Sequence, residues 1–341
     1  MSENQLMDWS ALGFEYHPTD WNARCTSRNG VWGEVEWTQS EYMTMHISAG
    51  CLHYGLEIFE GLKAFRGVDG KIRLFRADEN ARRMISSAER LCLAAPSVEQ
   101  FVDICAEVVR RNLRFVPPYE SGASLYLRPL LIGTNPFLGV KPALESTFIV
   151  FASPVGPYFK GGIAPIDVVI DRGQDRAAPR GTGDVKVGGN YASSMLSGYQ
   201  AHRSGYSNVL YLDAVERKYI EEFGAANFFA VRGNTYITPA SGSVLPSVTN
   251  KSLRRLATDM GMTVEERRIP VEELSEFDEA AACGTAAVVA PIGKVIDLQT
   301  NKIYDFGNKV GPYSLKLFNT LQDIQYGRTE DPYGWTTVVE V

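Results

Sequence analysis

The segment Asp184-Val-Lys-Val-Gly-Gly-Asn-Tyr191 holds a single lysine, Lys186, shortly before a turn that contains two glycines. A helix is predicted after the glycines, because apolar residues recur at helical spacing in the sequence that follows. These residues are Ala192, Met195, Leu196 and Tyr199. A lysine that is partly removed from water at such a turn has a lowered pKa, and its amine can act as a nucleophile or base. An ordinary surface lysine gives the same local pattern, so the segment alone leaves both interpretations open.

The composition indicates a soluble globular chain with two domains. The sequence has 341 residues, which exceeds the usual size of one hydrophobic core, and 45% of them are hydrophobic and 22% charged. The net charge is −6 and no basic block is present, which argues against nucleic acid or a membrane surface as a partner. The N-terminus resembles neither a signal nor a transit peptide, and no apolar run is long enough to span a bilayer. We therefore expect a cytoplasmic protein.

The cysteines and histidines argue against a disulfide scaffold or a metal site. The five cysteines are scattered, odd in number and without C-x-x-C spacing, which favours a reducing compartment. The four histidines show no H-x-x-x-H pairing. No metal is therefore expected.

The first half of the chain places an arginine at the edge of a predicted helix. The helix follows Asp78, and its apolar positions are spaced as one helix face. These positions are Ala81, Met84, Ile85, Ala88, Leu91 and Cys92. Arg83 lies at the margin of this face, where it either points inward or is a solvated helix arginine. A second helix is predicted over 98–113, and the two prolines that follow end it.

Two pairs of side chains in the first half are candidates for a binding pocket. A loop or short helix that leads into a strand contains Tyr54 and Phe59, although both also fit ordinary core positions. The alternating pattern of 123–132 predicts a strand from which Tyr126 and Arg128 project on one face. An arginine beside a tyrosine can bind a carboxylate in bidentate fashion. An ion pair with a local acid explains the arginine equally well.

The second half begins after a linker and is predicted to combine strands with helices. The segment 155–165, rich in glycine and aromatic residues, is the expected interdomain loop. Strands are predicted at 167–170, 208–212, 218–222, 227–231, 235–238 and 263–269. Arg232-Gly-Asn between two of these strands indicates a hairpin. We expect a mixed α/β (α+β) fold, with a smaller N-terminal α/β domain at 1–154 and a larger C-terminal domain at 166–341.

Three features of the second half fit a cofactor that carries an aldehyde, a pyridine ring and a phosphate. Such a cofactor needs an amine, an acid facing its ring nitrogen, and a phosphate cup. Lys186 is the candidate amine, and Glu222 stands at the end of a predicted strand. Residues 247–249 open a helix, and 284–286 form a second turn with a hydroxyl. A solvated turn acid, a simple helix cap and a tight bend are the ordinary alternatives. Together the features indicate pyridoxal 5'-phosphate, although their spacing alone does not establish it.

Longer motifs extend this pattern over nearly the whole chain. They are His53-Tyr-Gly, Phe59-Glu-Gly-Leu-Lys-Ala, Leu74-Phe-Arg, Leu125-Tyr-Leu-Arg-Pro, Lys186-Val-Gly-Gly-Asn-Tyr191, Glu222-Phe-Gly, Leu245-Pro-Ser-Val-Thr and Gly284-Thr-Ala-Ala. On these motifs the sequence resembles the branched-chain amino-acid aminotransferases of fold type IV, and most closely their bacterial form. The resemblance implies a two-domain architecture similar to that of D-amino-acid aminotransferase, with pyridoxal phosphate bound by the C-terminal domain. The thiol pair that mammalian members carry after the Gly-Thr-Ala turn is absent, since these positions read Ala287-Val-Val-Ala290.

The resemblance also implies which residues bind the cofactor. Lys186 matches the lysine that forms the Schiff base and moves the proton, and Glu222 matches the glutamate at the pyridinium nitrogen. Arg83, rather than Arg76, matches the arginine that binds the phosphate. The remaining contacts are implied at Tyr191 beside the ring oxygen, at Leu245 on the ring, and at Val248, Thr249 and Thr285 around the phosphate.

The substrate site follows from the same resemblance. The apolar side-chain pocket matches Phe59, Tyr126 and Val140, and Tyr54 and Val140 come from the other subunit of a homodimer. Amides of the Thr285-Ala286 turn hold the substrate α-carboxylate, and Arg128 at the pocket rim receives the side-chain carboxylate of glutamate.

The implied reaction is the transamination of leucine, isoleucine and valine with 2-oxoglutarate. Small amino acids and 2-oxo acids are thus the expected binding partners. A D-amino-acid aminotransferase, an aminodeoxychorismate lyase and a non-catalytic regulatory protein that binds the cofactor are the alternatives.

Overall fold

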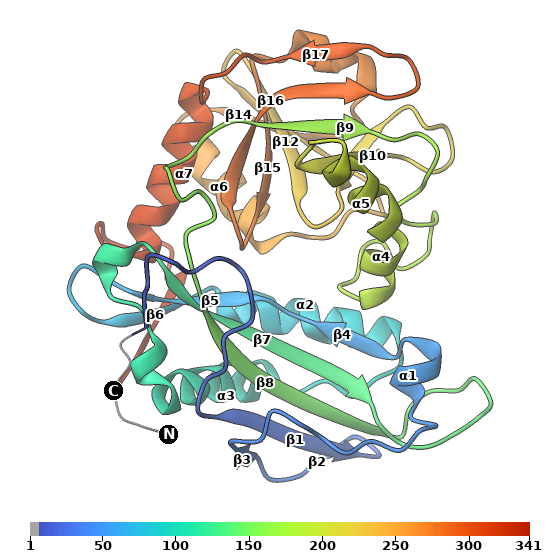
Figure 1. Ribbon diagram of the computed structural model, residues 1–341, viewed down its shortest axis with the longest axis vertical. Coiled ribbons are helices and arrows are strands. Elements are labelled where there is room, and N and C mark those ends of the chain that lie inside the picture. The colour runs from blue at the N-terminus through green and yellow to red at the C-terminus, as the bar shows by residue number, and fades with distance from the viewer. Residues whose placement is uncertain (1–6) are drawn as a thin grey trace. The chain divides into compact units, whose positions relative to one another are not determined.

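The computed structural model describes residues 7–341 and divides the chain into two compact units (Figure 1). Unit 1 consists of the chain up to Lys160 together with Asp323–Val341, and unit 2 consists of Gly161–Gln322. Among the described residues, no helix combines the length and apolar character that a membrane span requires.

Unit 1 is built on a nine-stranded sheet whose strands pair in antiparallel fashion. The order is β18-β6-β5-β7-β8-β1-β2, with β3 paired to β1 and β4 paired to β7. The strands are β1 (Asn22–Arg28), β2 (Val31–Trp32), β3 (Glu36–Thr38), β4 (Glu57–Phe59), β5 (Leu62–Arg66), β6 (Ile72–Phe75), β7 (Ser124–Gly133), β8 (Glu145–Val155) and β18 (Thr336–Val339). The strand predicted from the alternation at 123–132 is confirmed as β7.

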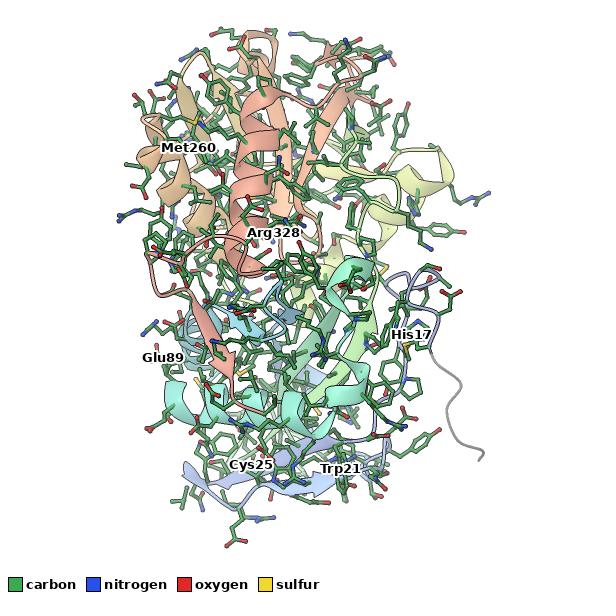
Figure 2. All side chains as sticks on the ribbon, turned by 90° about the vertical axis from the view of Figure 1, so that its left-hand side faces the viewer. His17, Trp21, Cys25, Glu89, Met260 and Arg328 are labelled. Carbon is green, nitrogen blue, oxygen red and sulfur yellow. The ribbon has the colours of Figure 1, made fainter. Side chains whose placement is uncertain are left out.

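The helices of unit 1 are α1 (Gly50–Tyr54), α2 (Ala77–Arg90) and α3 (Val98–Arg111). α2 and α3 pack on each other, and α3 also contacts β8. The hydroxyl of Ser97 accepts the N–H of Gln100 and so caps the start of α3. At its other end, the Arg111 guanidinium carbon lies 5.6 Å from the ring centre of Trp21, which Figure 2 labels. Both predicted helices of the first half are confirmed.

Unit 2 is built on a second nine-stranded sheet, in which six strands close into a ring. The path runs β11-β10-β9-β16-β15-β12-β13-β14, and an added pairing of β11 with β12 closes it. The strands are β9 (Ile166–Ile170), β10 (Asn208–Leu212), β11 (Ile220–Phe223), β12 (Asn227–Arg232), β13 (Thr235–Pro239), β14 (Thr263–Arg267), β15 (Glu279–Gly284), β16 (Val288–Asp297) and β17 (Ile303–Asp305). β12 and β13 form the expected antiparallel hairpin. Parallel pairs, such as β9 with β10, make the sheet mixed.

The helices of unit 2 are α4 (Gly188–Ser193), α5 (Met195–Arg203), α6 (Val248–Asp259) and α7 (Pro312–Gln325), with a 3-10 turn at Val271–Glu276. The helix predicted after the two glycines is present, but it is interrupted at Ser194. Its apolar residues Met195, Leu196 and Tyr199 are exposed, contrary to an ordinary buried stripe. α5 packs on β9 and β10 through the small residue Ala201 instead.

The C-terminal segment corrects the expected domain division. The sequence placed all of 166–341 in the second domain, whereas 323–341 belongs to unit 1. The reason is β18, which pairs with β6 in the unit 1 sheet, with Thr336 opposite Phe75 and Val339 opposite Ile72. Neither α7 nor β18 was predicted.

A buried carboxylate caps α7 across the fold of unit 2. Glu279 on β15 accepts the N–H of Tyr313 at 2.9 Å and the N–H of Ser314 at 2.8 Å. We expect Glu279→Ala to lower the free energy of unfolding by about 2 kcal/mol, because two helix N–H groups lose their acceptor. Denaturant unfolding measures this loss. Glu276→Ala, which removes an exposed carboxylate three residues earlier, is the matched control and should change stability by less than about 0.5 kcal/mol.

Candidate active site

Asn190 fixes the loop that carries Lys186. Its Nδ2 donates to the carbonyl oxygens of Thr182 at 2.6 Å and Val185 at 2.8 Å, and its Oδ1 accepts the Thr182 hydroxyl at 2.9 Å. Val185 and Val187 are buried on either side of the lysine, whereas Lys186 is half-buried. The backbone around Lys186 is therefore held on both sides.

The Lys186 amine lies against Tyr191 at the start of α4. Nζ donates to the Tyr191 hydroxyl oxygen at 2.7 Å and stands 5.1 Å from the centre of the tyrosine ring. These two predicted site residues are thus brought together. The phenol oxygen orients the amine by a direct hydrogen bond.

Glu222 on β11 is a buried carboxylate surrounded by donors. It accepts Asn227 Nδ2 at 2.6 Å and the Leu245 N–H at 3.1 Å, and it forms an ion pair with Arg176 at 3.0 Å. Burial raises the pKa of Glu222 to about 7, against the opposing charge of Arg176, the two hydrogen bonds and the charge of Lys186. Glu222 therefore interacts electrostatically with the predicted amine.

The sequence interpretation missed Arg176 and gave Asn227 no role. Arg176 is 5% exposed, but it lies in a loop, where burial leaves no periodic signal. It contacts the carbonyl oxygen of Ser243 in addition to Glu222. The one available signal for Asn227 was its place in the motif that begins at Glu222.

The start of α6 provides N–H groups close to Glu222. The Ser247 hydroxyl accepts the N–H of Asn250 at 3.2 Å and caps the helix. The N–H groups of Val248 and Thr249 point out of the first turn without partners in the helix ladder, so they can bind an anion. Leu245, which precedes the helix, donates its N–H to Glu222. The predicted phosphate cup and the predicted ring-nitrogen partner are thus connected through a short stretch of chain.

The Thr285-Ala286 turn lies at the same end of the unit 2 sheet. It connects β15 to β16 directly after Gly284. Glu222 pairs with Asn227 across β11 and β12, and Asn227 pairs with Cys283 across β12 and β15. This row places the turn close to the Glu222 end of its strand.

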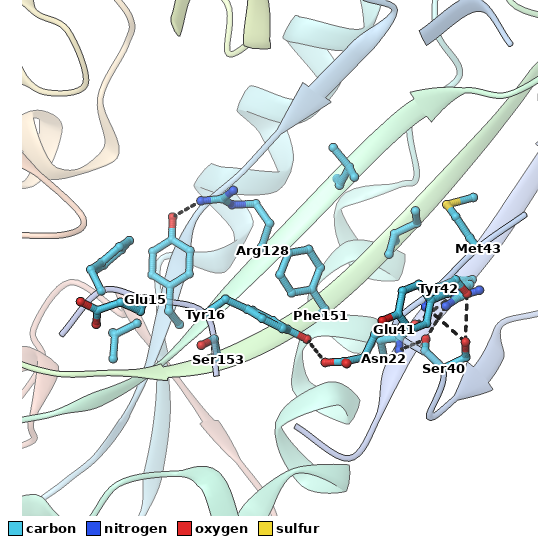
Figure 3. A pocket seen from close by; sticks show the side chains of 16 residues that line it. Glu15, Tyr16, Asn22, Ser40, Glu41, Tyr42, Met43, Arg128, Phe151 and Ser153 are labelled. Carbon is cyan, nitrogen blue, oxygen red and sulfur yellow. Dashed lines mark hydrogen bonds between the residues drawn. The ribbon is translucent and has the colours of Figure 1, made fainter. Parts of the chain in front are cut away.

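A second group of predicted residues comes together in unit 1, where Arg128 lies over two aromatic rings. Its guanidinium carbon is 5.0 Å from the ring centre of Phe59 and 5.4 Å from that of Tyr126, and Nη2 lies 3.4 Å from the Tyr126 hydroxyl oxygen (Figure 3). Tyr126 and Arg128 line a pocket of about 730 Å³ together with Phe151 and Leu130. Within residues 7–341, no carboxylate forms an ion pair with Arg128, so a local acid does not explain this arginine.

Arg83 on α2 is held by a buried glutamate. Nε and Nη2 contact the two carboxylate oxygens of Glu60 at 2.8 and 2.7 Å, and Asn80 donates to the same carboxylate at 2.8 Å. The Arg83 side chain is 10% exposed, which excludes a solvated helix arginine. Arg76 instead lies over the Trp335 ring.

Tyr54 and Val140 lie in another part of unit 1. The Tyr54 hydroxyl donates to the carbonyl oxygen of Leu138, and its ring stacks on Phe137. Val140 follows on the same loop and is 83% exposed. Their expected contribution to the site of a second subunit stays a prediction. So does the expected joint site of Arg83 and Lys186, which belong to different units.

Comparisons with known proteins place this geometry in context. The family described as amino-transferase class IV matches residues 57–295. The branched-chain-amino-acid aminotransferase of Helicobacter pylori (strain J99) is 48% identical, over 98% of this chain and 98% of that protein. The crystal structure of the Escherichia coli branched-chain amino acid aminotransferase aligns with a TM-score of 0.80 and 29% identity, covering 94% of this chain and 100% of that one. A second branched-chain amino acid aminotransferase (T.th.), in a crystal structure with pyridoxamine 5'-phosphate, aligns with a TM-score of 0.77 and 28% identity, covering 93% and 99%.

Proposed function

Because this chain belongs to the class IV aminotransferase family, we propose that it transfers the amino group of leucine, isoleucine and valine to 2-oxoglutarate. The products are branched-chain 2-oxo acids and L-glutamate, and the cofactor is pyridoxal 5'-phosphate. The observation that carries this proposal is the 48% identity to a branched-chain-amino-acid aminotransferase over nearly the full length of both chains. The alternative functions considered from the sequence have no comparable support.

The residues of unit 2 fit this cofactor. An amine, a buried carboxylate and a helix start lie near one end of one sheet, and they suit an aldehyde, a ring nitrogen and a phosphate. When bound, pyridoxal phosphate supplies an electron sink that allows the Cα proton of an amino acid to leave. Arg83 is the proposed cation for the phosphate, because Glu60 fixes its guanidinium.

Lys186 and Glu222 perform the proton chemistry. Lys186 holds the aldehyde carbon by its amine between turnovers and, once the substrate amine displaces it, carries the Cα proton. Tyr191 orients the Lys186 amine through the 2.7 Å hydrogen bond. Glu222 accepts the N–H of the ring nitrogen and keeps that nitrogen protonated.

The unit 1 pocket is the proposed side-chain subsite. Phe59 and Tyr126 supply apolar walls for leucine, isoleucine and valine, and Arg128 can receive the second carboxylate of glutamate. Apolar walls discriminate modestly between aliphatic side chains, so one pocket can accept all of these substrates. The N–H groups of Thr285 and Ala286 are the proposed donors to the substrate α-carboxylate.

We also propose a cytoplasmic homodimer in which Tyr54 and Val140 complete the site of the partner. The exposure of Val140 and the hydrogen bond from Tyr54 to the Val140 loop support a joint role. Light scattering measures the mass. A monomer with full activity would contradict this part of the proposal.

The substrate panel tests the function directly. Purified protein is loaded with pyridoxal phosphate, and each L-amino acid is added with 2-oxoglutarate while glutamate formation is measured. Leucine, isoleucine and valine should be converted, and D-alanine should not. Conversion of D-alanine alone would favour a D-amino-acid aminotransferase, and an absorbance spectrum that does not change with leucine would indicate a lyase or a regulatory protein.

The absence of a side chain at Gly61 sets the position of Tyr126. A Cβ on Gly61 would overlap the hydroxyl oxygen of Tyr126. We expect Gly61→Ala to lower kcat/KM for leucine by about 10- to 100-fold, because the tyrosine must move away from its pocket position. The loss should be smaller in a Tyr126→Phe background, since the overlapping oxygen is gone. Gly198→Ala is the control, because a Cβ there meets no atom within 4 Å.

A further inference from the structure

A line of buried hydrogen bonds runs through unit 2 and ends on Glu222. The Tyr236 hydroxyl donates to Asn250 Oδ1 at 2.8 Å, Asn250 Nδ2 donates to Asn227 Oδ1 at 3.1 Å, and Asn227 Nδ2 donates to Glu222 Oε2 at 2.6 Å. All four side chains are buried. They come from β13, α6, β12 and β11, and none of them except Glu222 has a role in the proposed chemistry.

Neighbouring groups force the direction of both amides. The Leu245 carbonyl oxygen can only accept, and it lies 3.1 Å from Asn227 Nδ2, so the NH2 group of Asn227 faces Leu245 and Glu222. Asn227 therefore presents its oxygen to Asn250, which must donate. Thr238 agrees with this orientation, because its hydroxyl donates to the Phe228 carbonyl oxygen at 2.8 Å and accepts Asn250 Nδ2 at 2.9 Å.

The fixed direction has a consequence for the charge of Glu222. Asn227, the Leu245 N–H and Arg176 all donate to this carboxylate, so a hydrogen on either oxygen would point at a donor. Burial acts the other way and raises the pKa of Glu222 to about 7. The other titratable groups that interact with it are Lys186 and Cys283. The donors therefore decide whether a buried carboxyl stays ionised at neutral pH.

We propose that Asn227 and Asn250 are positioning residues that hold Glu222 ionised and aimed at the cofactor ring nitrogen. Asn250 is the third residue of α6, so the same pair of amides ties Glu222 to the helix start that is proposed to bind the phosphate. One hydrogen-bond network thus sets the geometry at both ends of the cofactor site. This inference rests on the proposed role of Glu222.

The protonation of the ring nitrogen tests the proposal. The holoenzyme is loaded with pyridoxal phosphate that carries an isotope label at the ring nitrogen, and the nitrogen NMR signal is titrated from about pH 6 to about pH 9. In Asn227→Leu the ring nitrogen should lose its proton at a pH at least about one unit lower than in the unmodified enzyme, because one donor to Glu222 is gone. kcat for leucine should fall about tenfold with KM unchanged, because leucine does not contact Asn227.

Two further variants make the test decisive. Tyr236→Phe removes one hydroxyl at the far end of the line, and it should shift the midpoint in the same direction by a smaller amount. Asn112→Leu is the matched control: Asn112 is a buried amide of unit 1 with three hydrogen bonds to the backbone of Trp21 and Val108, and its loss should leave the midpoint unchanged.

The outcomes separate this proposal from the proposed function. If the midpoints of Asn227→Leu and Tyr236→Phe both coincide with that of the unmodified enzyme, the two amides do not control Glu222, whatever the activity. If the unmodified enzyme binds the cofactor but does not transaminate leucine, the substrate assignment is wrong, and the titration still decides the role of the amides. If Asn227→Leu does not fold, Tyr236→Phe alone decides.

Discussion

Replacement of Lys186 by alanine is expected to abolish the transamination of leucine, with kcat/KM reduced by about 10⁴-fold or more. The amine, which lies against Tyr191, is the group that attaches the cofactor and carries the Cα proton. The absorbance band of cofactor bound to the lysine should disappear as well. A variant that retained both turnover and this band would contradict the assignment of Lys186.

Two companion variants separate the charge of Lys186 from its reactivity. Lys186→Arg keeps a cation beside the Tyr191 ring, but a guanidinium does not give up its proton at neutral pH, so the same loss is expected. Tyr191→Phe removes the 2.7 Å hydrogen bond and leaves the amine in place. It should retain the absorbance band and lose about tenfold in kcat.

Glu222→Gln is expected to lower kcat by about 100- to 1000-fold, because the proposed acceptor for the ring nitrogen loses its charge. Stopped-flow absorbance of the reaction with leucine measures the effect on the chemical step. Glu221→Gln is the matched control. Glu221 is the adjacent residue on β11, it is equally buried, and its carboxylate accepts the Ser241 hydroxyl at 2.8 Å instead of facing Lys186. Equal losses in the two variants would show that burial of a charge, rather than its position, matters.

The same carboxyl makes the stability of the cofactor-free protein depend on pH. Burial raises the pKa of Glu222 from its ordinary value of 4.5 to about 7, so the folded state binds this proton more tightly than the unfolded state. The stabilisation is complete below about pH 4.5 and is lost as the pH rises through about 7. Unfolding of the unmodified protein should therefore become easier relative to Glu222→Gln over this range, by about 3 kcal/mol. A constant difference between the two proteins would contradict the raised pKa.

Strong local periodicity made much of the fold predictable from the sequence. The apolar face that contains Met84 repeats over several turns and gives α2, and Arg232-Gly-Asn between two apolar runs gives the β12–β13 hairpin. Lys186 and Glu222 were found because each stands in a distinctive motif. The grouping of Tyr126 with Arg128 followed from the two-residue period of a strand, which fixes the face from which each side chain projects.

Features that depend on distant partners could not be predicted. The periodicity that contains Met195 correctly gave a helix, but a repeat does not reveal which face is covered, and that face is exposed. Arg176 and Asn227 take their roles from segments far away in sequence, so no local pattern marks them. α7 carries a readable signal in the spacing of Leu317 and Leu321, which the polar residues around it obscured.

The pairing of β18 with β6 has a consequence for the synthesis of this protein. Unit 2 is continuous in sequence, so every residue it needs has been synthesised when Gln322 has been added. The sheet of unit 1 needs Thr336–Val339, which lie within the last six residues of the chain. The ribosome still encloses these residues when translation ends, so the edge next to β6 stays unpaired until the chain is released. The nascent protein therefore exposes an open strand edge for the whole of its elongation, and this interval is when a chaperone has the most to protect.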